Sequence, residues 1–384
     1  PPETDSREST TLNAVRSAIS RNSYYVVDQE RNEVRGHTFA LTDKGTSASG
    51  VHTWTIKFPP ESGNIVGFSR KAAQTEPVHA WVKVPGDRST MFKYVNPNVF
   101  FIATDDGRGI HAHLVEGVSG RIIYRVYHAK AKGPVYATLC ENWITYSYYD
   151  TDAQRHALSV LEVYDDSETR KNKAVSQLVL KSLFGRSTSS GTKKNMSSSA
   201  AGVRQVTDDD ETVLSSFTPP PLRVLGQSYF IRPGTKFMRV TASARGITGH
   251  QVLLGTDTDQ VVALDRRWLD PRRPTKPSAF DRDEGLIPYM EVLPLSPSSW
   301  VTNKNIVARL KDVVTAPTAL ESTVLCFARG VDVFYTRLHP SQSFDALDEE
   351  FSYGLLIISL LVVGVTALAT HRMSVKATSK RLWK

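Results

Sequence analysis

Cysteine is nearly absent from this chain of 384 residues, which contains only Cys140 and Cys326. Two cysteines cannot build the multi-bridge framework of small secreted domains. There is no C-x-x-C or C-x-x-C-H motif, which excludes the common zinc, redox and haem-attachment sites. Both residues lie in apolar runs, so we expect two buried thiols, with a bridge between them as the alternative.

The sequence also lacks the motifs of common enzyme and cofactor families. G-x-S-x-G, H-E-x-x-H, G-x-G-x-x-G, a P-loop and an EF-hand loop are all missing. His111 and His113 are the only close histidine pair, and no third ligand stands at a convincing spacing, so we expect a solvated strand or loop rather than a metal site. We therefore predict a noncatalytic protein without a metal or cofactor.

Charge is missing from one long stretch, residues 351–370, where ten of the 20 residues are Leu, Ile or Val. A helix of this length measures about 30 Å, which matches the hydrocarbon core of a bilayer. The aliphatic residues alone favour insertion by roughly 3–6 kcal/mol. The stretch predicts a transmembrane helix over 351–371, and a buried core helix is the weaker alternative.

The residues on either side of this stretch differ in charge. Four acidic residues precede it (Asp345, Asp348, Glu349, Glu350) and five basic ones follow it (Arg372, Lys376, Lys380, Arg381, Lys384). The positive-inside rule therefore places the C-terminus in the cytoplasm and the bulk of the chain in a lumen or outside the cell. These five residues supply most of the net charge of +8, so the basic character is a topology signal and does not predict nucleic-acid binding.

The predicted span contains no ionisable group, which favours an anchor or a packing partner over an ion path. Small residues such as Gly354 and Gly364 would let another helix approach closely, so we expect both glycines to bind a partner. The chain begins PPETDSREST, without an initiator Met or an apolar leader. Because a lumenal domain needs a route across the membrane, we expect this sequence to be the C-terminal part of a longer protein.

Short runs rich in β-branched and aromatic residues fill most of the remaining chain, and Gly, Pro, Asn or Asp interrupt them. A weak strand–turn–strand repeat recurs in YVVDQERNEVRGHTFAL, AHLVEGVSGRIIYRVY and QVVALDRRWLDPRRP. This pattern favours a mainly β fold, with β-propeller-like blades.

Residues 165–221 break the pattern, because they are rich in Ser, Thr and charge. We expect a disordered insert there, with a short amphipathic helix over AVSQLVLKSLFGR. Asn195 begins an Asn-Met-Ser glycosylation acceptor. The predicted organisation is blades at 1–164, the insert at 165–221, a β-rich region at 222–350, the span at 351–371 and a basic cytoplasmic tail at 372–384.

The segment LDPRRP, residues 269–274, is conformationally constrained, because its two prolines fix backbone torsions. It presents Arg272 and Arg273 from a rigid loop. A planar guanidinium suits fixed contacts with carboxylates, and two roles follow: an internal salt bridge or a partner-binding contact.

Several of these segments together resemble a known family, the largest lumenal subunit (subunit 1) of the endoplasmic reticulum membrane protein complex. The resemblance rests on ordered short motifs followed by one terminal membrane helix and a basic tail. In chain order these motifs are VNPN (95–98), GVSGRII (117–123), AKGPV (131–135), ENW (141–143), GQSY (226–229), RGITG (245–249), LDPRRP (269–274), LIPY (286–289), TAP (315–317), LEST (320–323) and FDALDEE.

The resemblance implies a partial β-propeller formed by C-terminal blades in the lumen of the endoplasmic reticulum, anchored as a single-pass type I membrane protein. It also implies a noncatalytic scaffold that supports insertion of tail-anchored and multi-pass proteins. The implied partners are the other subunits, membrane-protein clients and the lipid bilayer. Two alternatives remain: a type I surface receptor or adhesion protein with a propeller ectodomain, and an anchored quinone-type dehydrogenase, which would need a cofactor cage that the sequence does not show.

Overall fold

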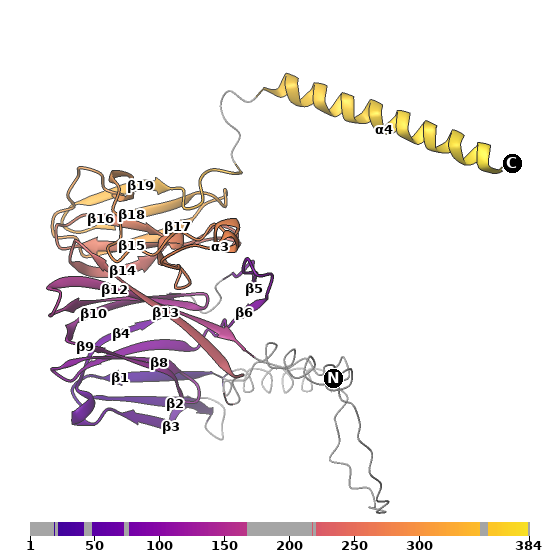
Figure 1. Ribbon diagram of the computed structural model, residues 1–384. Coiled ribbons are helices and arrows are strands. Elements are labelled where there is room, and N and C mark those ends of the chain that lie inside the picture. Colours follow the sequence, from indigo (N-terminus) through magenta and orange to yellow (C-terminus); the bar gives the residue numbers. More distant parts are fainter. Residues whose placement is uncertain are drawn as a thin grey trace, which may run out of the picture. The chain divides into compact units, whose positions relative to one another are not determined.

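The computed structural model describes residues 19, 22–41, 48–72, 77–166, 217, 220–345 and 352–382. In these ranges the chain forms five antiparallel sheets, and Figure 1 shows them stacked in chain order. The mainly β fold predicted from the sequence is therefore confirmed. The region up to Pro340 is one unit, and residues 341–384 are a second.

The sheets consist of strands close together in sequence. The first sheet contains β1 (Ser23–Asp28), β2 (Glu33–Leu41) and β3 (Ala48–Lys57), and the second contains β4 (Asn64–Arg70), β7 (Val99–Asp105), β8 (Gly109–Glu116) and β9 (Ile122–Ala129). The third contains β10 (Ala131–Cys140), β11 (Trp143–Asp150), β12 (Arg155–Asp165) and β13 (Leu222–Ile231), with the short strands β5 (Val82–Lys83) and β6 (Met91–Lys93) added beside β12. The fourth contains β14 (Thr235–Val240), β15 (Gln251–Thr256) and β16 (Val261–Asp265), and the fifth contains β17 (Asp312–Pro317), β18 (Val324–Arg329) and β19 (Val333–Leu338).

Central strands of the internal sheets, such as β7, β8 and β11, are buried on both faces, which explains why they read as continuous apolar runs. In β7, Phe100 and Ile102 pack toward the first sheet, whereas Phe101 and Ala103 pack toward the third. The alternation of side chains along a strand sends neighbouring residues into different cores. Four apolar clusters thus join the five sheets in succession.

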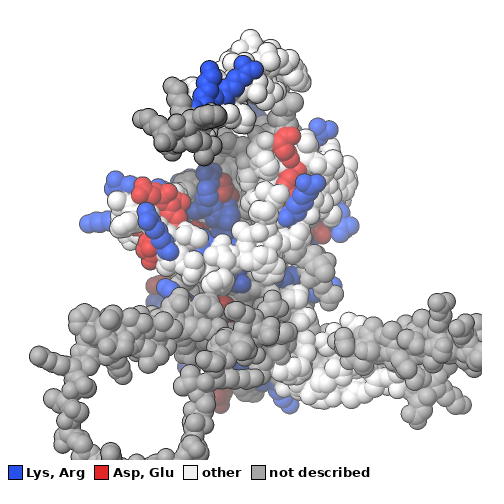
Figure 2. Space-filling model, turned by 90° about the vertical axis from the view of Figure 1, so that its right-hand side faces the viewer, with Lys and Arg blue, Asp and Glu red and all other residues white. Residues whose placement is uncertain are grey.

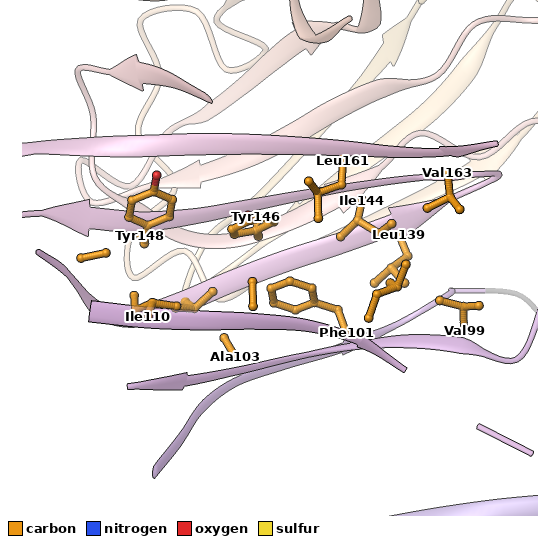
Figure 3. Packing of buried hydrophobic residues seen from close by; sticks show 14 of the residues in the cluster. Val99, Phe101, Ala103, Ile110, Leu139, Ile144, Tyr146, Tyr148, Leu161 and Val163 are labelled. Atoms are coloured by element: carbon orange, nitrogen blue, oxygen red, sulfur yellow. The ribbon is translucent and has the colours of Figure 1, made fainter. Parts of the chain in front are cut away.

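The largest of these clusters lies between the second and third sheets. Figure 3 shows Phe101 and Tyr146 facing each other from the two sheets, and their ring centroids are 4.9 Å apart. Burying one such aromatic side chain contributes about 1.5–3 kcal/mol. This packing holds the two sheets in a fixed relation.

Two of the three predicted strand–turn–strand units are present: β1 pairs with β2, and β8 pairs with β9. The third prediction is wrong. After β16 the chain enters the 3₁₀-helix η2 (Arg266–Leu269) and a long loop that contains the α-helix α3 (Ala279–Asp283) and the 3₁₀-helix η3 (Pro297–Ser299). Pro271 and Pro274 lack the N–H groups that a second strand would need. A further 3₁₀-helix, η1, spans Pro60–Ser62.

The second unit contains the helix α4 (Tyr353–Leu382), which is long and apolar enough to cross a membrane. Its 30 residues correspond to about 45 Å, so the helix continues beyond the predicted span into the basic segment. The apolar side chains of α4 are exposed within this chain, as expected of a helix whose surroundings are lipid or another protein.

Three predictions lie outside the described residues. They are the disorder of the insert, whose residues 167–216 and 218–219 are not described, the amphipathic helix within it, and glycosylation at Asn195. The insert follows β12, which ends at Asp165, and precedes β13, which begins at Leu222. These two strands pair along their whole length, so the insert connects adjacent strands of one sheet.

Candidate functional site

Segments far apart in the sequence meet where the third sheet packs on the fourth. They line a cavity of about 330 Å³ with residues from 80–93, 141–164, 246–250 and 266–270. Figure 2 shows the side of the molecule that carries β5, β6 and α3. Lys and Arg side chains lie there among acidic ones, and some of the basic side chains are recessed. We call the residues around this cavity the charged junction.

Arg273 lies next to the charged junction, in the loop after Asp270, and is only 2% exposed. Its guanidinium donates to the carbonyl oxygens of Trp268 (2.7 Å), Ile287 (3.1 Å) and Pro288. The guanidinium carbon also lies 5.3 Å from the ring centroids of both Tyr229 and Trp268. A planar fork of donors fits such a site, whereas the point charge of a lysine does not.

Three of the motifs that carry the family resemblance converge around Arg273. From GQSY, the Gln227 amide donates to the Arg273 carbonyl (3.0 Å) and the Tyr229 hydroxyl donates to the Asp270 carbonyl (3.0 Å). From LIPY, the Tyr289 backbone N–H donates to the Pro274 carbonyl (2.9 Å). The three motifs thus form one hydrogen-bonded unit that joins β13 to the loop after β16.

Asp270 lines the cavity and pairs with two basic side chains of the charged junction. Lys83 Nζ lies 2.8 Å from Asp270 Oδ2, and Arg272 bonds both Asp270 (3.0 Å) and Glu284. Although burial opposes ionisation of Asp270, Lys83 and Arg272 hold its pKa well below the ordinary value. Burial, assisted by Arg272 and Arg266, lowers the pKa of Lys83 to about 8, against the opposing effect of Asp270.

Glu162 lies deepest in the charged junction, on β12, and is 2% exposed. It pairs with Arg266, and the Tyr164 hydroxyl donates to it at 2.5 Å. Burial lowers the pKa of Arg266, whose guanidinium lies 4.9 Å from the ring of Trp143 in the ENW motif. Glu141 of the same motif pairs with Lys93 at 2.5 Å. ENW is therefore a fourth motif of the family resemblance that contributes residues to the charged junction.

RGITG and LEST meet at a second point on the fourth sheet. The Glu321 carboxylate accepts hydrogen bonds from the Ser243 hydroxyl (2.5 Å) and from the backbone N–H groups of Arg245 and Ile247 (both 3.0 Å). Despite burial, which acts in the other direction, these donors lower the pKa of Glu321. One carboxylate thus fixes the conformation of the RGITG loop.

These contacts hold the loops of the junction in place, because the carboxylates of Glu141, Glu162, Asp270 and Glu284 each face a basic side chain at short range. A pair of this kind stabilises one geometry, since removing either partner leaves a buried charge without compensation. Among the residues that the structure describes, no group of three or more His, Cys, Asp or Glu side chains is placed to hold a metal ion.

The predicted site residues have different surroundings. Arg272 forms internal salt bridges with Asp270 and Glu284, whereas Arg273 donates hydrogen bonds to carbonyl oxygens inside the domain. A partner contact of either residue stays a prediction. Gly354 and Gly364 lie on α4 with open space around the position of an added Cβ. Cys140 and Cys326 are both buried, as predicted, and the bridge between them is absent.

We expected His111 and His113 to lie on a solvated strand or loop, and this prediction is wrong for His113. Both lie on β8, but His113 is only 2% exposed because the second sheet is covered on both faces. Burial, helped by the charges of Arg125 and His111, lowers the pKa of His113 to about 4. His111 instead faces Asp106, at 3.3 Å.

The sequence interpretation did not identify most members of the charged junction. Lys83, Glu162, Arg266, Glu284 and Glu321 were all missed. One available signal was the charge of Glu162 within the apolar run LSVLEVYD, because a buried charge in a strand requires a partner. The partner itself could not be identified, since it lies about a hundred residues away.

Comparison with known proteins gives one consistent result. A family model described as "ER membrane protein complex subunit 1, second beta-propeller" matches residues 3–341. Proteins named "ER membrane protein complex subunit 1" are 30% identical to the chain in Gallus gallus and in Xenopus laevis, over 94% of the chain and 33% of each relative. The relative of that name in Schizosaccharomyces pombe is 24% identical over 93% of the chain and 37% of its own length. The chain thus spans about a third of the length of these relatives.

Proposed function

Because the chain belongs to the ER membrane protein complex subunit 1 family, we propose that it is a noncatalytic, single-pass scaffold subunit of that complex. The matched family domain is a β-propeller, and the described part of the chain contains one apolar helix that can span a membrane. In the proposed role, the subunit supports insertion and folding of tail-anchored and multi-pass membrane proteins. It contributes a rigid body and an anchor to this process, and other subunits perform the insertion.

The composition of α4 is the observation that carries this proposal. Its stretch from Gly354 to Thr370 contains no ionisable side chain, and its apolar side chains are exposed within this chain. A helix that moved ions or polar segments would need polar groups in its interior. An uncharged helix attached to a rigid stack of sheets instead suits an anchor for assembly.

Charge around α4 supports a type I orientation in the endoplasmic reticulum membrane. Acidic residues precede the helix and five basic residues follow its apolar part, with no acid among them. The positive-inside rule then puts the stack of sheets in the lumen and the basic end in the cytoplasm. The relatives reported above all carry the name of the complex, so we favour this location over that of a surface receptor.

The proposed partners are the other subunits, membrane-protein clients and lipid. Gly354 and Gly364 lie within about 80° of each other around the helix axis, and side chains are absent at both positions. Such a strip lets a second helix approach closely, which strengthens dispersion contacts where the hydrophobic effect is weak. We propose this strip as the contact with another membrane subunit.

Affinity purification from mildly solubilised microsomes tests the proposal. We expect the wild-type chain, within its full-length protein, to recover other subunits of the complex. Gly354→Leu combined with Gly364→Leu should lose most of that recovery, because the two side chains block close approach. Ser359→Leu is the matched control, since Ser359 is another small residue and lies on the opposite side of the helix.

The possible results separate the two parts of the proposal. Recovery of no other complex subunit by the wild-type protein would contradict the scaffold role itself. Equal recovery by the glycine double variant and the Ser359 control would contradict only the helix contact. Both variants should remain in the membrane fraction, because neither introduces a charge.

A further inference from the structure

Four large apolar side chains are exposed on loops at the rim of the charged junction. Their exposed fractions are 54% for Trp81, 57% for Val84, 46% for Ile247 and 63% for Phe280. The internal sheets bury comparable side chains almost completely. The described part of the chain therefore leaves these four side chains uncovered, and together we call them the apolar rim.

Contacts between the backbones bring together the loops that carry the apolar rim. Gly86, next to Val84, packs so closely on α3 that an added Cβ would lie 2.3 Å from the Phe280 carbonyl oxygen. The Gly86 N–H also donates to Glu284 at 3.0 Å. On the other side, an added Cβ at Gly246, next to Ile247, would lie 2.1 Å from the Pro77 carbonyl oxygen.

The charged junction fixes these loops from beneath. Lys83, between Trp81 and Val84, is held by Asp270, and Glu284 at the end of α3 is held by Arg272. Ile247 lies in the loop whose backbone is held by Glu321. These contacts thus hold the loops in one conformation, with their apolar side chains exposed. A loop without such contacts would not be fixed in this way.

Charges around the apolar rim are more often positive than negative. The exposed charged residues of 77–90, 243–250 and 275–285 are Arg88, Arg245, Lys276 and Arg282 on one hand and Asp87 and Asp283 on the other. Aromatic and aliphatic side chains surrounded by basic ones have the composition of surfaces that bind the headgroup region of a bilayer.

The connection between the last strand and α4 is short. The last strand ends beside η2 and the part of the following loop that contains η3, because Leu338 and His339 line one cavity together with Trp268 and Ser298. From Pro340, 13 residues lead to Tyr353, where α4 begins, and they can span at most about 45 Å. A membrane-embedded α4 therefore limits how far the domain can move from the bilayer.

We propose that the apolar rim, formed by Trp81, Val84, Ile247 and Phe280, contacts lipid and seats the domain on the bilayer surface. This inference rests on the proposed membrane anchoring by α4. Lipid fits the surface better than a protein partner, because a stable protein interface needs roughly 800 Å² of complementary area per partner. Four side chains at separate loop ends provide less area, but each can enter the headgroup layer by itself.

Quenching of tryptophan fluorescence by brominated lipids tests the proposal. The full chain is reconstituted in nanodiscs with either ordinary or brominated phospholipids, and Trp383 is replaced by Phe because it follows α4. We expect brominated lipid to quench the Trp383→Phe protein. The added change Trp81→Phe should abolish most of this quenching, whereas Trp54→Phe, in the first sheet, should preserve it.

A second pair of variants tests the surface without changing the probe. Ile247→Asp with Phe280→Asp should reduce quenching of Trp81 at least severalfold. Val331→Asp should not, although Val331 is 69% exposed and lies at the turn between β18 and β19. Thermal unfolding of each variant shows whether the domain remains folded.

Equal fluorescence of the Trp383→Phe protein in ordinary and brominated lipid would overturn the lipid contact. The lipid contact would also be overturned if Trp81 became shielded from solvent only when other subunits are added, because the apolar rim would then bind protein. Resistance of the chain to alkaline carbonate extraction reports on α4 alone. Failure of the rim proposal is thereby distinguished from failure of the membrane anchor.

Discussion

Arg273 shows how one side chain determines the conformation of a loop. Its guanidinium satisfies carbonyl oxygens from both ends of the loop between η2 and LIPY and lies near two aromatic rings. Arg273→Ala should lower the free energy of unfolding by about 3 kcal/mol, because a buried side chain is removed and three part-buried carbonyl groups lose their donor. Arg273→Lys should recover only part of this loss, since an ammonium cannot reproduce the planar fork.

Chemical denaturation of the purified protein measures both changes. Arg267→Ala is the matched control, because Arg267 lies in the same segment, its side chain is 74% exposed and it pairs only at the surface. Its effect should stay within about 0.5 kcal/mol. A similar loss for Arg267 and Arg273 would mean that the contacts of Arg273 are not the source of stability.

A buried histidine, His113, and a half-buried one, His128, predict sensitivity to acid. Burial is the main cause that lowers the pKa of His113 and of His128 to about 4 in the folded chain, whereas an unfolded histidine titrates near 6.5. Between pH 6.5 and 4 the unfolded state therefore binds more protons than the folded state. The free energy of unfolding should fall as pH falls through this window, by roughly 3 kcal/mol for each histidine at pH 4.

His128→Gln should make this pH dependence shallower. The His128 ring contacts the hydroxyl groups of Tyr146 (2.6 Å) and Tyr148 (3.1 Å), which a glutamine amide can also approach. Melting temperatures at pH 7 and pH 4.5 give the measurement, and His52→Gln, at an exposed position, is the control. If the double variant of His113 and His128 kept the slope of the wild type, other groups would dominate acid unfolding.

At the scale of single elements, the positions of strands were easier to predict from the sequence than the distant residues that their side chains contact. Runs such as NVFFIAT and WITYSYYD became β7 and β11 because β-branched and aromatic residues suit a strand that is buried on both faces. HAWVKV yielded only the two-residue strand β5. Its Lys83 is instead directed to Asp270, a residue 187 positions away that local pattern cannot reveal.

The helix α4 allows a prediction of its own. Val362→Asp places a charge near the middle of the apolar stretch and should cost about 2.5–3.5 kcal/mol of insertion free energy. Alkaline carbonate extraction should release a large share of this variant from membranes. Val375→Asp should remain largely integrated, because it lies among the basic residues at the end of the helix. Equal retention of Val362→Asp and wild type would argue against a single spanning helix.

At the scale of the whole molecule, orientation across the membrane is the property to test. Protease added to sealed microsomes should remove an epitope placed after Lys384 and leave the large body intact, because the basic residues after the span favour the cytoplasm. Detergent should then make the body accessible. Digestion of the body in sealed vesicles would contradict both the lumenal location and the proposed role.

Family membership and the kind of fold could be predicted from short motifs, yet the reason for those motifs could not. GQSY, LDPRRP and LIPY lie within 64 residues of sequence and meet around Arg273, while ENW and Lys83 reach the same junction from the third sheet. The sequence identified LDPRRP as rigid, because proline restricts its own backbone. It could not identify the carbonyl groups and carboxylates that hold it, because these depend on how the sheets pack.

Composition and local pattern alone determined three properties of this protein. They are the strand-rich body, the single apolar helix and the asymmetry of charge around it, all of which depend on neighbouring residues. Only the tertiary structure decided which charges pair, which histidine is buried and which apolar side chains remain exposed. The physical reason is that burial and ion pairing depend on distances in space, and the pairs that matter here join residues separated by up to 187 positions in the chain.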